Sequence, residues 1–199
     1  MVGGAPTWGI TTVGGTTAGS GQSYATVGAA VDAGESIILV TQNTFETKDI
    51  ILPRSTSVTI ENGVTVEMSG YVWGFNGNRS LIIEGNGSLR FNTANRHRTF
   101  FQASGTNSVL NLSDINLINA TNNLACLTDI DYARMHNVLY DGNCVVCGDY
   151  NLYSDSIYRN GTLAFQVGCV SSNVAGSVGQ NVVVVDSGTN CLLGDMVVA

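Results

Sequence analysis

A short strand-like phrase that recurs along the chain constrains its fold more than any other feature. Residues 57–63, Ser-Val-Thr-Ile-Glu-Asn-Gly, are closely matched by residues 80–87, Ser-Leu-Ile-Ile-Glu-Gly-Asn-Gly, which begin 23 residues later. A third copy begins at Ser108, and weaker copies continue as far as Asp186. Repeats of about 20 to 50 residues indicate a solenoid or a similar repeat architecture, and strand-like repeats with variable loops indicate a β-solenoid.

Glycine-containing dipeptides leave a second architecture open. Asn62-Gly63, Asn86-Gly87 and Asp141-Gly142 are typical of hairpin turns, which an antiparallel sandwich would use. The near copies at Ser57 and Ser80 favour parallel stacking over the sandwich. We therefore predict an all-β, right-handed parallel β-helix over residues 23–199, preceded by a Gly/Thr-rich leader or docking segment over residues 1–22.

One helix is predicted before the first strands. Ser23 can cap its start, and Val27, Ala30 and Val31 fall on one face at helical spacing. Gly34 stands where a helix ends in a left-handed conformation. A short N-terminal capping α-helix over residues 23–33 is therefore expected.

The composition excludes several classes of partner. Only 12% of the residues are charged and the net charge is -7, so the chain lacks the clustered cations that nucleic acid requires. No run of 18 apolar residues predicts a membrane-spanning helix. Equivalent residues of stacked rungs lie about 4.8 Å apart, where like charges repel, so stacking itself favours a surface of Asn, Ser and Thr.

Five cysteines lie in the second half of the chain: Cys126, Cys144, Cys147, Cys169 and Cys191. The odd number excludes a complete disulfide framework. Cys144 and Cys147 form a CxxC pair, but there is no second pair to complete a zinc site. Buried, reduced thiols are the favoured interpretation, with a disulfide as the alternative, and no metal or cofactor is predicted.

The residues from Tyr24 to Gly34, followed by strand-like segments at 37–40, 50–53 and 58–60, resemble the opening of pectate-lyase-like β-helix proteins. In that superfamily a helix caps the solenoid before the first rungs. The resemblance covers about a fifth of the chain and implies a fold more than an activity. The superfamily includes pectate lyases, polygalacturonases and other glycosidases, as well as bacteriophage tailspikes, which this chain resembles most in character.

The enzymatic motifs of that superfamily are not matched. The Asn-Thr-Asp strand, the Asp-Asp pair and the Gly-His-Gly turn that the resemblance would bring from polygalacturonases are absent, and no lyase-like set of calcium ligands can be assembled. Asp129 and Asp131 are the remaining catalytic candidates, because alternate residues of a strand point to the same side and glycoside hydrolysis uses two carboxylates. The simpler interpretation is that both acids bind turn amides.

Exposed aromatic rings can stack on sugars. Tyr71, Trp73 and Tyr132 are therefore candidate glycan-binding residues, although filling of the core is the ordinary explanation for such aromatics.

The function favoured by the sequence is a virion-associated spike or tail-fibre domain that binds a host surface polysaccharide. The surface is typical of an extracellular protein, while residues 1–20 show no secretory signal, and a protein made in the host cytoplasm and released by lysis reconciles the two. A homotrimer is expected, with the leader available to other virion proteins. The alternatives are an extracellular polysaccharide lyase or glycoside hydrolase, and a non-catalytic structural or adhesive module.

Overall fold

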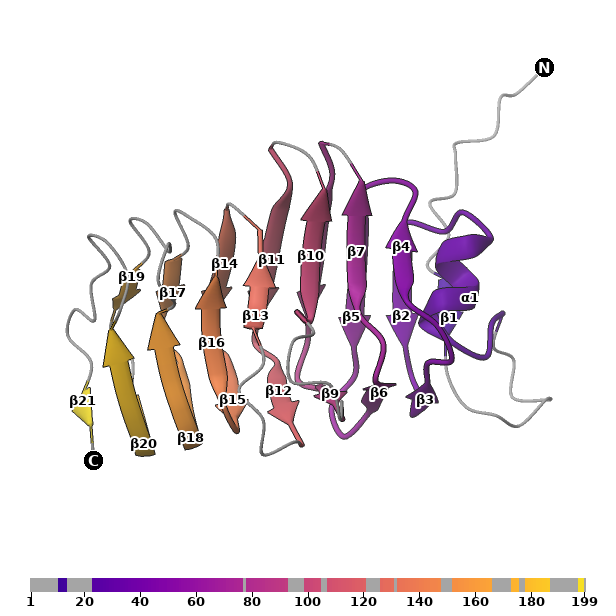
Figure 1. The fold of residues 1–199 in the computed structure, drawn as a ribbon. Coiled ribbons are helices and arrows are strands. Elements are labelled where there is room, and N and C mark those ends of the chain that lie inside the picture. Colours follow the sequence, from indigo (N-terminus) through magenta and orange to yellow (C-terminus); the bar gives the residue numbers. More distant parts are fainter. Residues whose placement is uncertain are drawn as a thin grey trace, which may run out of the picture.

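The computed structural model describes residues 11–13, 23–76, 78–92, 99–104, 107–120, 126–130, 132–147, 152–165, 173–175, 178–186 and 197–198. Within these residues the chain winds as a solenoid with three faces, in which every strand pairing is parallel (Figure 1). The helix lies at one end of the stack and the last strand at the other (Figure 1). The predicted all-β parallel solenoid is confirmed, and the sandwich alternative is excluded.

The first face is an eight-stranded sheet. Its strands, in spatial order, are β1 (Thr11–Val13), β2 (Ile37–Val40), β5 (Thr56–Ile60), β8 (Ser80–Glu84), β11 (Val109–Ser113), β14 (Ala133–His136), β17 (Leu152–Ser154) and β19 (Asn173–Ala175). β1 comes from the predicted leader, so part of that segment joins the sheet.

The second and third faces belong to one sheet that doubles back through β18 (Ile157–Phe165). The second face contains β3 (Thr44–Phe45), β6 (Thr65–Ser69), β9 (Ser88–Phe91), β12 (Asn116–Asn119) and β15 (Leu139–Asp141). The third face contains β4 (Ile50–Leu52), β7 (Trp73–Asn76), β10 (Phe101–Ser104), β13 (Cys126–Asp129) and β16 (Cys144–Cys147). β18 pairs with β15 through its first residues and with β16 through its last, and it is followed by β20 (Val178–Asp186) and β21 (Val197–Val198).

The helix α1 (Val27–Asp32) is shorter than predicted. Its N-cap is Thr26, whose hydroxyl accepts a hydrogen bond from the Ala29 amide, so the expected cap at Ser23 is wrong. Gly34 has a φ of +90°, which confirms the predicted left-handed end. Among the residues that the structure describes, no helix is long and apolar enough to cross a membrane.

A buried carboxylate holds α1 against the first rung. Glu46, only 3% exposed, accepts hydrogen bonds from the Val27 amide at 3.0 Å and from the Gly28 amide at 2.9 Å. These are two of the amides at the start of a helix that lack partners within it. Burial raises the pKa of Glu46, and the amides of Gly28 and Val27 oppose that rise.

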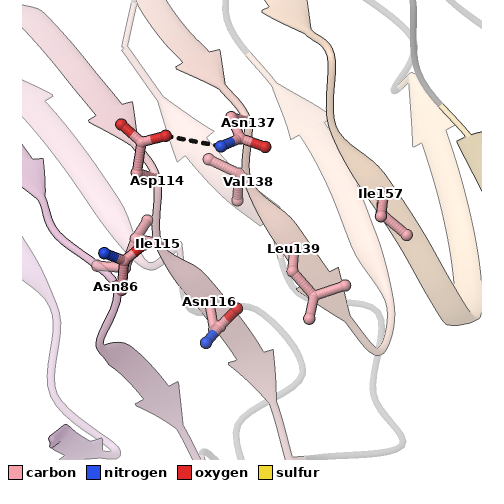
Figure 2. A pocket seen from close by; sticks show the side chains of 8 residues that line it. All are labelled: Asn86, Asp114, Ile115, Asn116, Asn137, Val138, Leu139 and Ile157. Atoms are coloured by element: carbon pink, nitrogen blue, oxygen red, sulfur yellow. Dashed lines mark hydrogen bonds between the residues drawn. The ribbon is translucent and has the colours of Figure 1, made fainter. Parts of the chain in front are cut away.

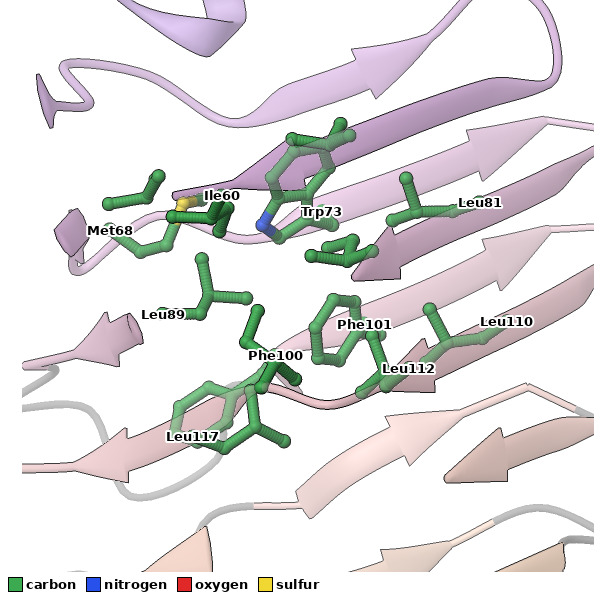
Figure 3. Packing of buried hydrophobic residues seen from close by; sticks show 14 of the residues in the cluster. Ile60, Met68, Trp73, Leu81, Leu89, Phe100, Phe101, Leu110, Leu112 and Leu117 are labelled. Atoms are coloured by element: carbon green, nitrogen blue, oxygen red, sulfur yellow. The ribbon is translucent and has the colours of Figure 1, made fainter. Parts of the chain in front are cut away.

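The interior is filled by side chains that stack from rung to rung (Figure 3). Val58 aligns with Ile83 on the first face, and alternation along each strand sends these residues inward. Phe91 stacks on Phe100 with ring centroids 3.9 Å apart. The core therefore runs continuously along the solenoid axis.

The register of the repeats differs from the sequence alignment. Ser57 pairs with Ile82, two residues beyond Ser80, while on the second face Thr65 pairs with Ser88 and keeps the 23-residue offset. Ser80 in turn pairs with Val109, one residue beyond the predicted Ser108. The Ser57 alignment is wrong by two residues, which keeps the same side chains facing inward, so alternation in the sequence cannot reveal the error. The Ser108 alignment is wrong by one residue, a shift that would turn the buried side chains outward.

Candidate functional site

A column of polar side chains follows the corner at which the chain leaves the first face and enters the second, which we call the first corner. Asp114, Asn137 and Asp155 occupy equivalent positions there in three successive rungs, with φ angles of 54°, 52° and 50°. Gly85 occupies the corner of the preceding rung with a φ of +104°. Asn and Asp tolerate this left-handed conformation better than other non-glycine residues, which explains their choice.

The residue after each of these three is buried. These residues are Ile115, Val138 and Ser156, each at most 2% exposed. Each corner is thus a two-residue turn that directs one side chain to solvent and the next into the core, which fixes the direction of the polar column.

Neighbouring rungs are connected by side-chain contacts along this column. Asn137 Nδ2 donates to Asp114 Oδ1 at 2.6 Å (Figure 2). His136 Nδ1 lies 3.2 Å from Asp155 Oδ2 and 3.2 Å from Ser154 Oγ. His136 and Asp155 remain about 60% exposed, so both are accessible to a ligand.

A groove of about 300 Å³ lies beside the column (Figure 2). It is lined by Asn86, Asp114, Ile115, Asn116, Asn137, Val138, Leu139 and Ile157. Four of these residues are polar and four are aliphatic, and they come from four successive rungs. Ile115 and Val138 are buried, so Leu139 and Ile157 supply the accessible apolar surface. The groove therefore offers hydrogen-bonding groups alongside apolar contact, the combination that small-molecule sites use.

The charge of the groove is negative. Asp114 is the charged residue among the eight that line it, and none of them carries a positive charge. Within the described part of the chain, no group of three or more His, Cys, Asp or Glu side chains is arranged to hold a metal ion. The polar side chains that line the groove can hydrogen-bond to hydroxyl and amide groups.

The aromatic candidates do not form this groove. Trp73 has no exposed surface and packs in the core (Figure 3), so its predicted stacking on a sugar is wrong. Tyr71 is partly buried against the core at the corner between the second and third faces. Tyr132 is 42% exposed, but it precedes β14 at the corner between the third and first faces, so the two tyrosines cannot form one platform.

The acidic candidates and the cysteines are only partly within the described residues. The backbone of Asp129 pairs with Gln102 and Cys147 on the third face, while its side chain and the whole of Asp131 lie outside the described residues. Cys126, Cys144 and Cys147 occupy β13 and β16, and their side chains also lie outside them. The proposed carboxylate pair and the state of the thiols stay predictions.

The sequence contained a weak signal for the groove. Asp114 ends the repeat copy that begins at Ser108, Asn137 lies within a weaker copy over residues 135–138, and Asp155 follows another over residues 150–153. In the structure each of the three directly follows a first-face strand. Only the true register shows that these three residues form one column, and the 23- and 28-residue offsets did not provide it.

Comparison with known proteins gives no family. No family model matches the chain, and no curated protein matches it. Among solved structures, a protein from Parabacteroides merdae ATCC 43184 described as a "putative glycosyl hydrolase" is 12% identical, with a TM-score of 0.44 over 85% of this chain and 86% of that one. A likeness at this level supports no argument about activity, so the parallel solenoid rests on the strand pairing of this chain itself.

Proposed function

We propose that this protein is a carbohydrate-binding β-solenoid, with the groove at the first corner as its glycan site. The observation that carries the proposal is the alignment of Asn86, Asp114 and Asn137 along a groove whose other side includes the accessible aliphatic residues Leu139 and Ile157. Planar amide and carboxylate groups hydrogen-bond to sugar hydroxyls, and aliphatic side chains contact the apolar faces of sugar rings.

Replacement of Asn137 by glycine tests the proposal without straining the turn. Glycine already occupies the equivalent corner position at Gly85, so Asn137→Gly removes the amide and keeps the left-handed backbone. We expect glycan affinity to fall about 5- to 30-fold, the loss of one or two hydrogen bonds. Binding is measured by calorimetry with a glycan selected from an array of bacterial and plant polysaccharides.

Asn78→Gly is the matched control. Asn78 is exposed, and it lies between β7 and β8 at the opposite end of the first-face strands. Its replacement should leave affinity unchanged. Equal loss of affinity in the two variants, or no binding by the parent protein to any glycan on the array, would reject the groove as the site.

The biological setting proposed from the sequence is a virion spike or tail fibre that binds a host surface polysaccharide as a homotrimer. A low-charge stacked surface is compatible with this setting, and an extracellular binding module is the alternative. Light scattering distinguishes a trimer from a monomer. A monomer at micromolar concentration would favour the extracellular module.

Glycoside hydrolysis is a second candidate function, because two carboxylates flank Asn137. Asp114 and Asp155 are two rungs apart, which places their Cα atoms about 9.6 Å from each other. Inverting glycosidases use carboxyl groups roughly 6.5 to 9.5 Å apart. One acid would protonate the glycosidic oxygen while the other takes a proton from the water that attacks the anomeric carbon.

Asp114→Asn tests this second function. Asn keeps the shape and tolerates the left-handed φ, but it cannot transfer the proton, so release of new reducing ends should fall at least 100-fold. Glu61→Gln, an exposed acid in an earlier rung, should retain activity. If the parent protein releases no reducing ends from any glycan that it binds, the site is a binding site without hydrolytic activity.

A further inference from the structure

The backbone is continuous across the first corner, which gives the polar column a fixed spacing. The Asn116 amide donates to the Gly87 carbonyl at 3.0 Å, the Leu139 amide to the Ile115 carbonyl at 3.1 Å, and the Ile157 amide to the Val138 carbonyl at 2.9 Å. Rungs joined in this way lie about 4.8 Å apart. Equivalent positions of the corner therefore recur at a regular spacing, with one position in each rung.

Each rung carries one exposed hydrogen-bonding side chain at this corner. Asn86, Asp114, Asn137 and Asp155 supply them in four successive rungs, the first three lining the groove and the fourth continuing the column beside Ile157. The column thus has a direction, parallel to the solenoid axis.

Two aliphatic side chains lie beside the column in its last two rungs. Strand pairing on the second face aligns Leu139 with Ile157, which remains 38% exposed, and the two preceding rungs place Asn116 and Ser88 in the same row. The polar column and this aliphatic pair run parallel to each other. A ligand that uses both must be extended and must lie along the axis.

The charges around the polar column restrict the chemical class of the ligand. Asp114 and Asp155 are both acidic, and the ring of His136 contacts Asp155. Arg159, which follows Ile157 on the second face, is paired with Asp141, and Arg134 belongs to the first face. The chain as a whole carries a net charge of -7. Polyuronates would be repelled, whereas neutral or amino sugars would not.

We infer that the groove binds a neutral or amino-sugar polysaccharide in extended form along the solenoid axis, with one sugar unit per rung over four rungs. This inference rests on the proposed glycan-binding function. A pyranose unit in an extended chain has a length close to one rung, so successive units meet successive members of the column, and Leu139 and Ile157 contact the ring faces of the last two units.

Chain-length dependence tests the inference. The probes are cello-, manno-, chito- and galacturono-oligosaccharides of two to six units, titrated into the full chain by calorimetry. Affinity for one neutral or amino series should rise roughly three- to tenfold with each added unit up to four, and then level off. The galacturonate series should bind at least tenfold more weakly than that series.

Two variants test the length of the site and its preference for uncharged sugars. Asp155→Gly removes the fourth side chain of the polar column without straining the corner. It should make affinity level off at three sugar units instead of four. Asp114→Asn preserves shape but removes a negative charge, so it should narrow the gap between the galacturonate and neutral series. Asn78→Gly should change neither result.

The outcomes separate this inference from the function on which it rests. No binding in any series, together with no binding on the array, rejects the glycan-binding function itself. Binding that does not depend on chain length, or that levels off at the same length in Asp155→Gly, rejects the axial register. Galacturonate binding as tight as the neutral series rejects the assignment of ligand class.

Discussion

Gly85→Ala should lower the free energy of unfolding by about 3 to 5 kcal/mol, the largest effect that we expect from a single methyl group in this protein. A Cβ at Gly85 would lie 2.4 Å from the Ile60 carbonyl oxygen of the rung below. That atom is backbone and cannot move without opening the corner. The φ of +104° adds the cost of a conformation that L-residues rarely adopt.

Two other glycines separate the contributions of strain and collision. Gly63, at the same corner one rung earlier, has a φ of +77° but nothing within 4 Å of its Cβ position, so Gly63→Ala should cost about 1 to 2 kcal/mol. Gly70 has no positive φ and nothing within 4 Å, so Gly70→Ala should change stability by less than about 0.5 kcal/mol. Urea unfolding measures all three, and equal losses at Gly63 and Gly85 would show that the rungs are not tightly stacked there.

Glu46→Ala should lower the free energy of unfolding by about 2 to 4 kcal/mol, because it leaves the buried Val27 and Gly28 amides without their acceptor. The hydroxyl of Thr44, which donates to Glu46 at 3.2 Å, also loses its partner. Glu61→Ala, at an exposed acid, is the control and should have little effect. A loss at Glu46 no larger than that at Glu61 would show that the carboxylate does not hold the helix.

The pH dependence of stability tests the burial of the same carboxyl group. Its pKa is raised in the folded protein, so between the ordinary value of 4.5 and the raised value the native state keeps a proton that the unfolded chain releases. The stability of the parent protein relative to Glu46→Gln should therefore fall as pH rises through this window, because Gln does not titrate. Thermal unfolding of both proteins across the window measures the difference, and a relative stability that rises with pH would show that the hydrogen bonds outweigh burial.

Much of the fold could be predicted from short-range patterns. Alternating apolar residues in the phrases at Ser57 and Ser80 indicated strands buried on one side, and Gly34 marked the end of the helix. The cap was misplaced at Ser23 because both Ser23 and Thr26 are good capping residues. Only the packing of Val27 and the contact to Glu46 selects Thr26.

The candidate site was harder to predict than the fold. Trp73 is a candidate sugar-binding residue in the sequence because the sequence does not show whether an aromatic side chain on a strand faces the core or the solvent. Its pairing with Ile50 and Phe101 on the third face places it in the core column. Conversely, Asp114 and Asn137 have the properties of ordinary turn residues in the sequence, and they become a site only where the rungs stack.

The sequence alone determined that this chain consists of short repeated strands with a low-charge surface and favoured their parallel stacking, because strand periodicity and repeat length are local properties of the chain. The tertiary structure alone decided which residues of different rungs stand side by side, since register depends on how the buried side chains of one rung pack on the next. Asp114, Asn137 and Asp155 are separated in the sequence by unequal lengths and share a corner only through that packing. The groove beside them is therefore a property of the register, which loops of variable length conceal from the sequence.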